Sequence, residues 1–160
     1  MKLKKGPKIV LIILVLLAFI FIGSAVFWMY LASPVDTNDK RAIEVVIPEG
    51  VTHINSYAFA ALTALKKVTL PKSLVNIASN AFIGCKNLQN IILPESVASI
   101  GYYSFLNCKS LESIIIKNSN CEIYNSKYTI SSTATIYGYT NSTAQAYAKK
   151  YNRTFVEITE

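Results

Sequence analysis

The chain of 160 residues has only one histidine, three cysteines and nine acidic residues, which leaves little material for a catalytic or metal site. A Ser-His-acid or Cys-His arrangement would have to use His53, and no acid is placed beside it by spacing. The sequence has no C-x-x-C pair to suggest a zinc site and no glycine-rich phosphate loop. Three cysteines also do not make a disulfide framework. We therefore expect a protein that is not an enzyme, with no catalytic residues, no metal and no cofactor.

Acidic residues are outnumbered by basic ones, and the net charge is +7. Four of the lysines lie within the first eight residues, so residues 33–160 contain 12 basic and 9 acidic residues, a net charge of +3. These charges are too few and too scattered for a nucleic-acid footprint. We expect no nucleic-acid partner.

Charge is absent from Ile9 to Ala32, a stretch of 24 residues. At a rise of about 1.5 Å per residue, a helix of this length crosses the ~30 Å hydrocarbon core of a bilayer. The aromatic cluster from Phe27 to Tyr30 favours a retained transmembrane signal anchor, because aromatic side chains prefer the membrane boundary. The small residues before Val26 leave open the alternative, a signal peptide cleaved near Ala25 and a secreted product. The lysines of residues 1–8 keep that tail in the cytoplasm, so we expect the remainder to be extracellular.

Residues 33–43 are polar and without periodicity, which is typical of a linker. Beyond them, side chains recur every 23 residues in units that run from Val45 to Lys67, from Val68 to Asn90 and from Ile91 to Ser113. A unit this short cannot bury its apolar side chains alone, so the period predicts coils stacked on one another over residues 44–130. The recurring residues include Phe59, Phe82 and Phe105; Pro48, Pro71 and Pro94; Ile54, Ile77 and Ile100; and Leu65, Leu88 and Leu111.

Each unit begins with a triplet of mostly β-branched residues before proline, which predicts a short strand because proline has no amide donor to continue it. Asn80 to Gly84 is too short for an ordinary α-helix, and we expect a turn of 3₁₀ type there. The fourth unit starts at Ile114 and fades, but Ile123 still matches Ile100. Tyr128 matches Phe105 in the same way, so one more coil is expected before the pattern ends.

Residues 131–160 are expected to cap the array, because its last coil would otherwise expose backbone and apolar side chains. Thr135 to Tyr137 predicts a strand, Ser142 and Gln145 form a capping box for a helix, and Phe155 to Ile158 alternates like an edge strand. Most of the tyrosines follow residue 100, and packing is expected to explain them, with an aromatic binding surface as the alternative. The tyrosines predicted to face the core are Tyr128, Tyr147 and Tyr151.

The segment from Ala81 to Leu88, Ala-Phe-Ile-Gly-Cys-Lys-Asn-Leu, and the preceding Leu-x-x-Val/Ile-x-Leu/Ile-Pro pattern resemble the BspA-type leucine-rich repeat over about residues 44–128. The resemblance implies a leucine-rich-repeat solenoid, made mostly of short parallel β-strands with turns or 3₁₀ segments. A C-terminal α/β cap would close it, and one transmembrane helix would precede it in this chain. It also implies a cell-surface role in adhesion or binding. The first unit departs from the pattern, because Ala60-Ala61-Leu62 lacks the pair that is Gly84-Cys85 in the second unit and Asn107-Cys108 in the third.

Cys85 and Cys108 hold the same place in neighbouring coils. Stacked strands lie about 4.8 Å apart, a separation that allows a disulfide, although side chains pointing the same way meet the required torsion poorly. The resemblance implies instead a stack of buried thiols, and both alternatives stay open at this point. Cys121 aligns with Val75 and Ala98 on another wall, and we expect it to be a single small residue.

The outward face of the first strand in each unit is the candidate binding strip. If Val68 and Leu70 point inward, alternation turns Lys67 and Thr69 outward, and the period copies them along the array. The outer row that contains Thr69 is mostly apolar, which is unusual for a sheet face in water and ordinary for a surface that meets a partner. Strand propensity alone is the alternative explanation. The candidate strip comprises Glu44, Val46, Lys67, Thr69, Asn90, Ile92, Ser113 and Ile115.

These expectations together predict a membrane-anchored extracellular leucine-rich-repeat module, non-catalytic, that binds an extracellular protein or glycan. Its membrane partner would be contacted through Ile9 to Ala32. The alternative is a structural subunit of a membrane or cell-envelope assembly, since a short array offers little independent binding area.

Overall fold

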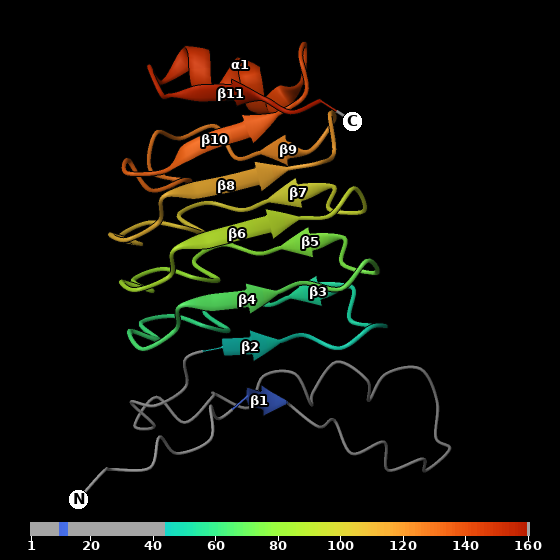
Figure 1. Ribbon diagram of the computed structural model, residues 1–160, viewed down its shortest axis with the longest axis vertical. Coiled ribbons are helices and arrows are strands. Elements are labelled where there is room, and N and C mark those ends of the chain that lie inside the picture. The colour runs from blue at the N-terminus through green and yellow to red at the C-terminus, as the bar shows by residue number, and fades with distance from the viewer. Residues whose placement is uncertain (1–9, 13–43, 160) are drawn as a thin grey trace, which may run out of the picture.

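The computed structural model describes residues 10–12 and 44–159, which form a parallel β-solenoid closed at its C-terminal end by one helix (Figure 1). Each coil contributes a strand to a seven-stranded sheet, and four coils add a shorter strand to a second sheet behind it. The first sheet contains, in spatial order, β1 (Val10–Ile12), β2 (Glu44–Val46), β4 (Lys67–Thr69), β6 (Asn90–Leu93), β8 (Ser113–Ile116), β10 (Thr135–Gly138) and β11 (Phe155–Glu157). The second contains β3 (His53–Ile54), β5 (Asn76–Ile77), β7 (Ser99–Ile100) and β9 (Glu122–Ile123).

The register of the first sheet agrees with the alternation predicted from the sequence. Val45 lies beside Val68, and Ile91 beside Ile114, and all four side chains are buried. The residues on either side of each of them turn outward or are partly exposed. Because a shift of one residue would exchange the two faces of every strand, this register decides which side chains can meet a partner.

The phenylalanines of three coils form a buried column, as the 23-residue period predicts. The ring centroids of Phe59 and Phe82 are 5.1 Å apart, and those of Phe82 and Phe105 are 5.3 Å apart, with nearly parallel planes. The segment around Phe82 consists of hydrogen-bonded turns, such as the bond from the Cys85 amide to the Phe82 carbonyl, and not a continuous 3₁₀ helix. Each turn also bonds to the next coil, so the column is fixed by backbone as well as by packing.

Cys85 and Cys108 are free, buried thiols and are not bridged. Their Sγ atoms donate to the carbonyl oxygens of Phe59 and Phe82 at 3.0 and 3.1 Å. Desolvation raises the pKa of both thiols to about 12. Cys121 is likewise free and buried.

The fourth coil departs from the period. The Phe59 amide donates to the carbonyl oxygen of residue 81, and the Phe82 amide to that of residue 104, each 22 positions later. The Phe105 amide donates to the carbonyl oxygen of Thr129, 24 positions later. The corner before Thr129 is therefore two residues longer than its equivalents, and Ile130, not Tyr128, lies beside Phe105. The prediction that Tyr128 faces the core is wrong, because the longer corner carries it to the surface, where it is 46% exposed.

The predicted cap is present. Helix α1 (Thr143–Lys150) begins after Ser142, whose hydroxyl accepts from the Gln145 amide, and the Gln145 side chain accepts from the Asn141 amide. The helix buries Ala144, Tyr147 and Ala148 against the last coil, and Tyr151, also predicted to face the core, is partly buried against it. Strand β11 then pairs in parallel with β10.

The N-terminal predictions fall largely outside the described residues. Three residues of the predicted span form β1, which pairs in parallel with β2. The predicted tail (1–8), the predicted linker (33–43) and the remaining residues of the predicted span (9–32) lie outside the described residues. Within the part that the structure describes, no helix combines the length and apolar character needed to cross a bilayer.

Candidate binding surface

The outer face of the seven-stranded sheet carries the apolar row predicted from the sequence. Val46 is 37% exposed and Ile92 is 52% exposed, Thr69 is exposed, and Ile115 is partly exposed. Neighbouring strands hold these residues side by side, with Val46 opposite Thr69 and Ile92 opposite Ile115. Side chains that are neither in the core nor fully polar thus form a continuous row across four strands.

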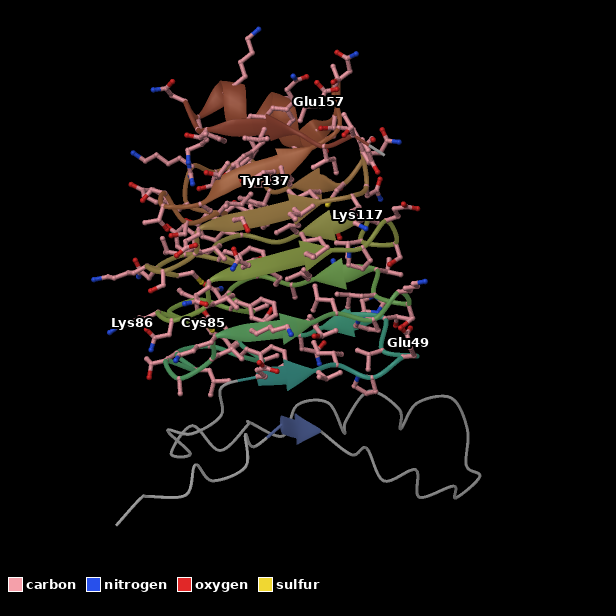
Figure 2. The ribbon with its side chains drawn as sticks, in the orientation of Figure 1. Glu49, Cys85, Lys86, Lys117, Tyr137 and Glu157 are labelled. Atoms are coloured by element: carbon pink, nitrogen blue, oxygen red, sulfur yellow. The ribbon has the colours of Figure 1, made fainter. Side chains whose placement is uncertain are left out.

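The row extends further than the sequence predicted. Tyr137 on β10 lies opposite Ile115, and Val156 on β11 lies opposite Tyr137 and is 40% exposed. Figure 2 shows Tyr137 on this face of the stack. The period missed both residues because Tyr137 follows Ile115 by 22 positions and Val156 follows Tyr137 by 19. The outer apolar row therefore comprises Val46, Thr69, Ile92, Ile115, Tyr137 and Val156.

A polar row runs beside the apolar one, at the start of each strand. Glu44 lies opposite Lys67, Lys67 opposite Asn90, and Asn90 opposite Ser113. The Ser113 hydroxyl donates to the Asn90 side-chain oxygen at 2.6 Å. All predicted residues of the candidate strip are thus placed on one face.

A groove of about 900 Å³ follows β4 and β6 on this face. Ile92 and Pro94 supply apolar lining, and Glu95 is the single carboxylate among the lining residues. The Ser96 hydroxyl oxygen, also in the lining, is buried and has no hydrogen-bond partner among the described residues. The remaining lining consists of four basic residues and five uncharged ones, namely Lys66, Lys67, Lys72 and Lys117, and Val68, Thr69, Leu70, Gln89 and Asn90.

Charges alternate where the strands end. The Lys72 amide donates to the Glu49 carboxylate at 3.1 Å, which holds Glu49 beside the next coil. Glu49 and Lys117 lie on the same side of the stack in Figure 2. This contact is a hydrogen bond from the backbone to a carboxylate and not an ion pair between the two side chains, and it links neighbouring coils at the edge of the face.

His53 lies on β3 in the second sheet, away from the groove lining. It is opposite Asn76, which in turn is opposite Ser99, and its Nδ1 is 2.8 Å from the Thr52 hydroxyl. In residues 10–12 and 44–159, no group of three or more His, Cys, Asp or Glu side chains is placed to hold a metal ion. The surface offers recognition by shape, apolar contact and charge.

Comparisons with known proteins agree with this architecture. The family model described as BspA type Leucine rich repeat region matches residues 38–153 in 6 copies, so it extends past the predicted repeats into the cap. No curated protein matches the chain. The crystal structure of the pneumococcal vaccine antigen PcpA is similar, with a TM-score of 0.51 and 20% identity, over 76% of this chain and 37% of that one. At this identity the similarity shows the fold alone, and the chain spans well under half of that structure's length.

Proposed function

The chain belongs to the BspA type leucine-rich repeat family, whose solenoid is a non-catalytic binding scaffold, and we propose that it is a membrane-anchored extracellular binding module. Its ligand is an extracellular protein or glycan. The ligand contacts the outer apolar row and the adjoining groove. The N-terminal apolar segment holds the module at the cell surface.

The exposure of Ile92 supports this proposal most strongly. Its side chain is 52% exposed at the centre of the row and lines the groove. Strand propensity would favour a β-branched residue there, but it would not require a groove with basic residues along its length. An apolar row rimmed by polar side chains is typical of interaction surfaces.

A structural subunit of an envelope assembly is the second candidate. Strand β11 pairs with β10 and with no other described strand, and it carries the exposed Val156. An edge strand with an exposed apolar side chain is a place where another chain can add. In this alternative the row would be covered permanently by a neighbouring subunit.

The binding face is tested by making Ile92→Lys and Ile115→Lys together, since neither side chain belongs to the core. The matched control is Val75→Lys with Ala98→Lys, two exposed positions in neighbouring coils next to the second sheet. Binding of each purified chain to intact cells and to extracellular matrix is measured by flow cytometry and plate assay. We expect the first pair to lose binding and the control pair to retain it. A folded first pair that still binds would exclude this face.

The anchor is tested by adding protease to intact cells that express the chain. The four lysines before the apolar segment predict that residues 33–160 are removed from outside. A single crossing between residues 9 and 32 would put Val10–Ile12 and β2 on different sides of the hydrocarbon core, so the anchored chain would not keep the pairing of β1 with β2. A mature chain that begins near Val26 and is found free in the medium would contradict the anchor.

A further inference from the structure

Four tyrosines gather on the corners that follow β7 and β9. The Tyr102 and Tyr103 rings stack with centroids 3.5 Å apart, Tyr124 is tilted against Tyr102 at 5.0 Å, and Tyr128 meets Tyr103 edge-on at 5.9 Å. Tyr124 and Tyr128 are 52% and 46% exposed. A side-chain hydrogen bond with Tyr103 raises the pKa of Tyr102 to about 12. We call these four residues the tyrosine patch.

Core packing does not explain the tyrosine patch. The longer corner of the fourth coil is what brings Tyr128 out of the core and onto Tyr103. Tyr103 itself has φ of 58°, a left-handed conformation that is costly for a bulky side chain. The equivalent residue of the preceding coil is Asn80, with φ of 61°, and asparagine adopts this conformation readily. Tyr57 of the first coil has φ of 62° as well, so the patch is distinguished not by this conformation but by the contacts of Tyr103 with Tyr102 and Tyr128.

The two corners that carry the patch contain one lysine and no acidic residue, and Glu122 on β9 stands two residues before Tyr124. The Lys127 ammonium lies 4.9 Å from the centroid of the Tyr128 ring. Lys150 donates to the Asn125 side-chain oxygen at 2.7 Å, and the Tyr151 hydroxyl donates to the same oxygen. Neither corner, at 101–107 or 124–130, contains an aspartate or glutamate. A negatively charged ligand would meet no opposing carboxylate from these corners.

The size of the patch selects among possible ligands. A tyrosine side chain buries roughly 150–250 Å² when fully covered, so four partly exposed rings offer at most about 400 Å². A stable protein interface needs about 800 Å² from each partner. Single-stranded nucleic acid would need a basic track along the backbone, and two lysines do not provide one. One or two sugar rings fit the area, since a sugar has an apolar C–H face for the rings and hydroxyl groups for their edges.

We propose that the tyrosine patch binds a glycan whose sugar rings carry carboxylate groups. The C–H faces of the sugars lie on the exposed tyrosine rings, and Lys127 binds the carboxylate. This site shares no residue with the groove on β4 and β6. It is a second site, and its existence does not depend on the function proposed for the groove.

The proposal is tested with the full chain in detergent and two probes, a hyaluronan hexasaccharide and the same hexasaccharide with its carboxylates reduced to alcohols. Ligand-observed NMR and calorimetry give the affinities. We expect the acidic probe to bind about fivefold more tightly than the reduced one, the size of one exposed charge contact. Tyr103→Asn should weaken binding about tenfold, as the loss of one stacking ring would. Lys127→Gln should abolish the preference for the acidic probe.

Tyr57→Asn is the matched control. Tyr57 is the equivalent residue of the first coil, has φ of 62° and is 62% exposed, but lies outside the patch. It should bind the acidic probe as the parent does. Tyr128→Ser removes a ring with no backbone strain involved and should weaken binding as Tyr103→Asn does. The proposal is overturned if neither probe binds, if Tyr57→Asn weakens binding equally, or if decathymidylate binds more tightly with the same dependence on Tyr103.

Discussion

The coils between residues 44 and 113 are built from side chains similar to those of the coil that follows them. The two regions differ in the spacing of equivalent residues. In the first region, equivalent residues are 23 positions apart and occupy equivalent environments, as the column of Phe59, Phe82 and Phe105 shows. In the fourth coil, Ile130 follows Phe105 by 25 positions while Thr135 follows Ser113 by 22. The comparison teaches that a strand register can survive changes in corner length. The contacts among Tyr102, Tyr103, Tyr124 and Tyr128 then arise where a corner departs from the repeat.

The largest expected effect is in the regular region. Phe82→Ala should lower the free energy of unfolding by about 3–5 kcal/mol, because the ring is fully buried and stacks on both neighbours. Tyr128→Ala, at the position that the period would place in the same column, should change it by no more than about 0.5 kcal/mol. Urea unfolding of the two variants measures both. Equal losses would mean that Tyr128 belongs to the column and that the two regions do not differ.

The buried thiols test whether the regular coils and the fourth coil exclude solvent equally well. Burial raises the pKa of Cys85 and of Cys121 to about 12 from the ordinary value of 9.0. Because the folded chain holds the thiol proton more tightly than the unfolded chain, each thiol contributes to the free energy of unfolding. This contribution is fully present below pH 9 and is lost as the pH rises toward 12. At pH 10 the loss is on the order of 1 kcal/mol for each thiol.

The measurement is the fall in unfolding free energy between pH 8 and pH 10. Cys85→Ala and Cys121→Ala should each reduce that fall by a similar amount relative to the parent chain, because burial raises the pKa of both thiols to about 12. A smaller reduction for Cys121→Ala would show that the fourth coil admits solvent where the regular coils do not.

The cap supports the irregular coil through one side chain. The Tyr147 hydroxyl donates to the Ser126 carbonyl at 2.8 Å and accepts from the Ile130 amide at 3.3 Å. Tyr147→Phe should therefore cost about 1–3 kcal/mol, because two backbone groups at the long corner lose their partner. The control is Tyr151→Phe, whose hydroxyl bonds to an exposed side chain and which should cost less than about 1 kcal/mol. Amide exchange at Ile130 would locate the effect, and unchanged exchange in Tyr147→Phe would contradict it.

The sequence predicted the regular region well because one residue pattern fixes both strand and corner there. Val68 and Ile91 face the core, and Thr69 and Ile92 face outward, as period-two alternation requires. The end of the outer row could not be predicted in this way. Tyr137 reaches it through strand pairing after a corner of different length, and pairing between strands is not visible in a fixed period.

The tyrosine patch was missed for the same physical reason. Aligning Tyr128 with Phe105 assumed that each corner has equal length, and two additional residues placed the ring in solvent. The only signal available was compositional, in that aromatic residues accumulate after residue 100. Composition could suggest an aromatic surface, but it could not identify which rings meet.

The smallest expected effect concerns the first coil, where one corner residue differs in type from its equivalents but has the same left-handed backbone conformation. Ala61 has φ of 56° at the place where the next two coils have Gly84 and Asn107, with φ of 73° and 60°. A left-handed alanine costs about 1–2 kcal/mol, and glycine recovers part of this while adding entropy to the unfolded chain. Ala61→Gly should therefore raise the unfolding free energy by about 0.5–1 kcal/mol, and Gly84→Ala should lower it by about 1–2 kcal/mol. Thermal unfolding of the two variants measures both signs. If Ala61→Gly destabilises the chain, the first coil does not share the corner of its neighbours, and the regular region begins one coil later.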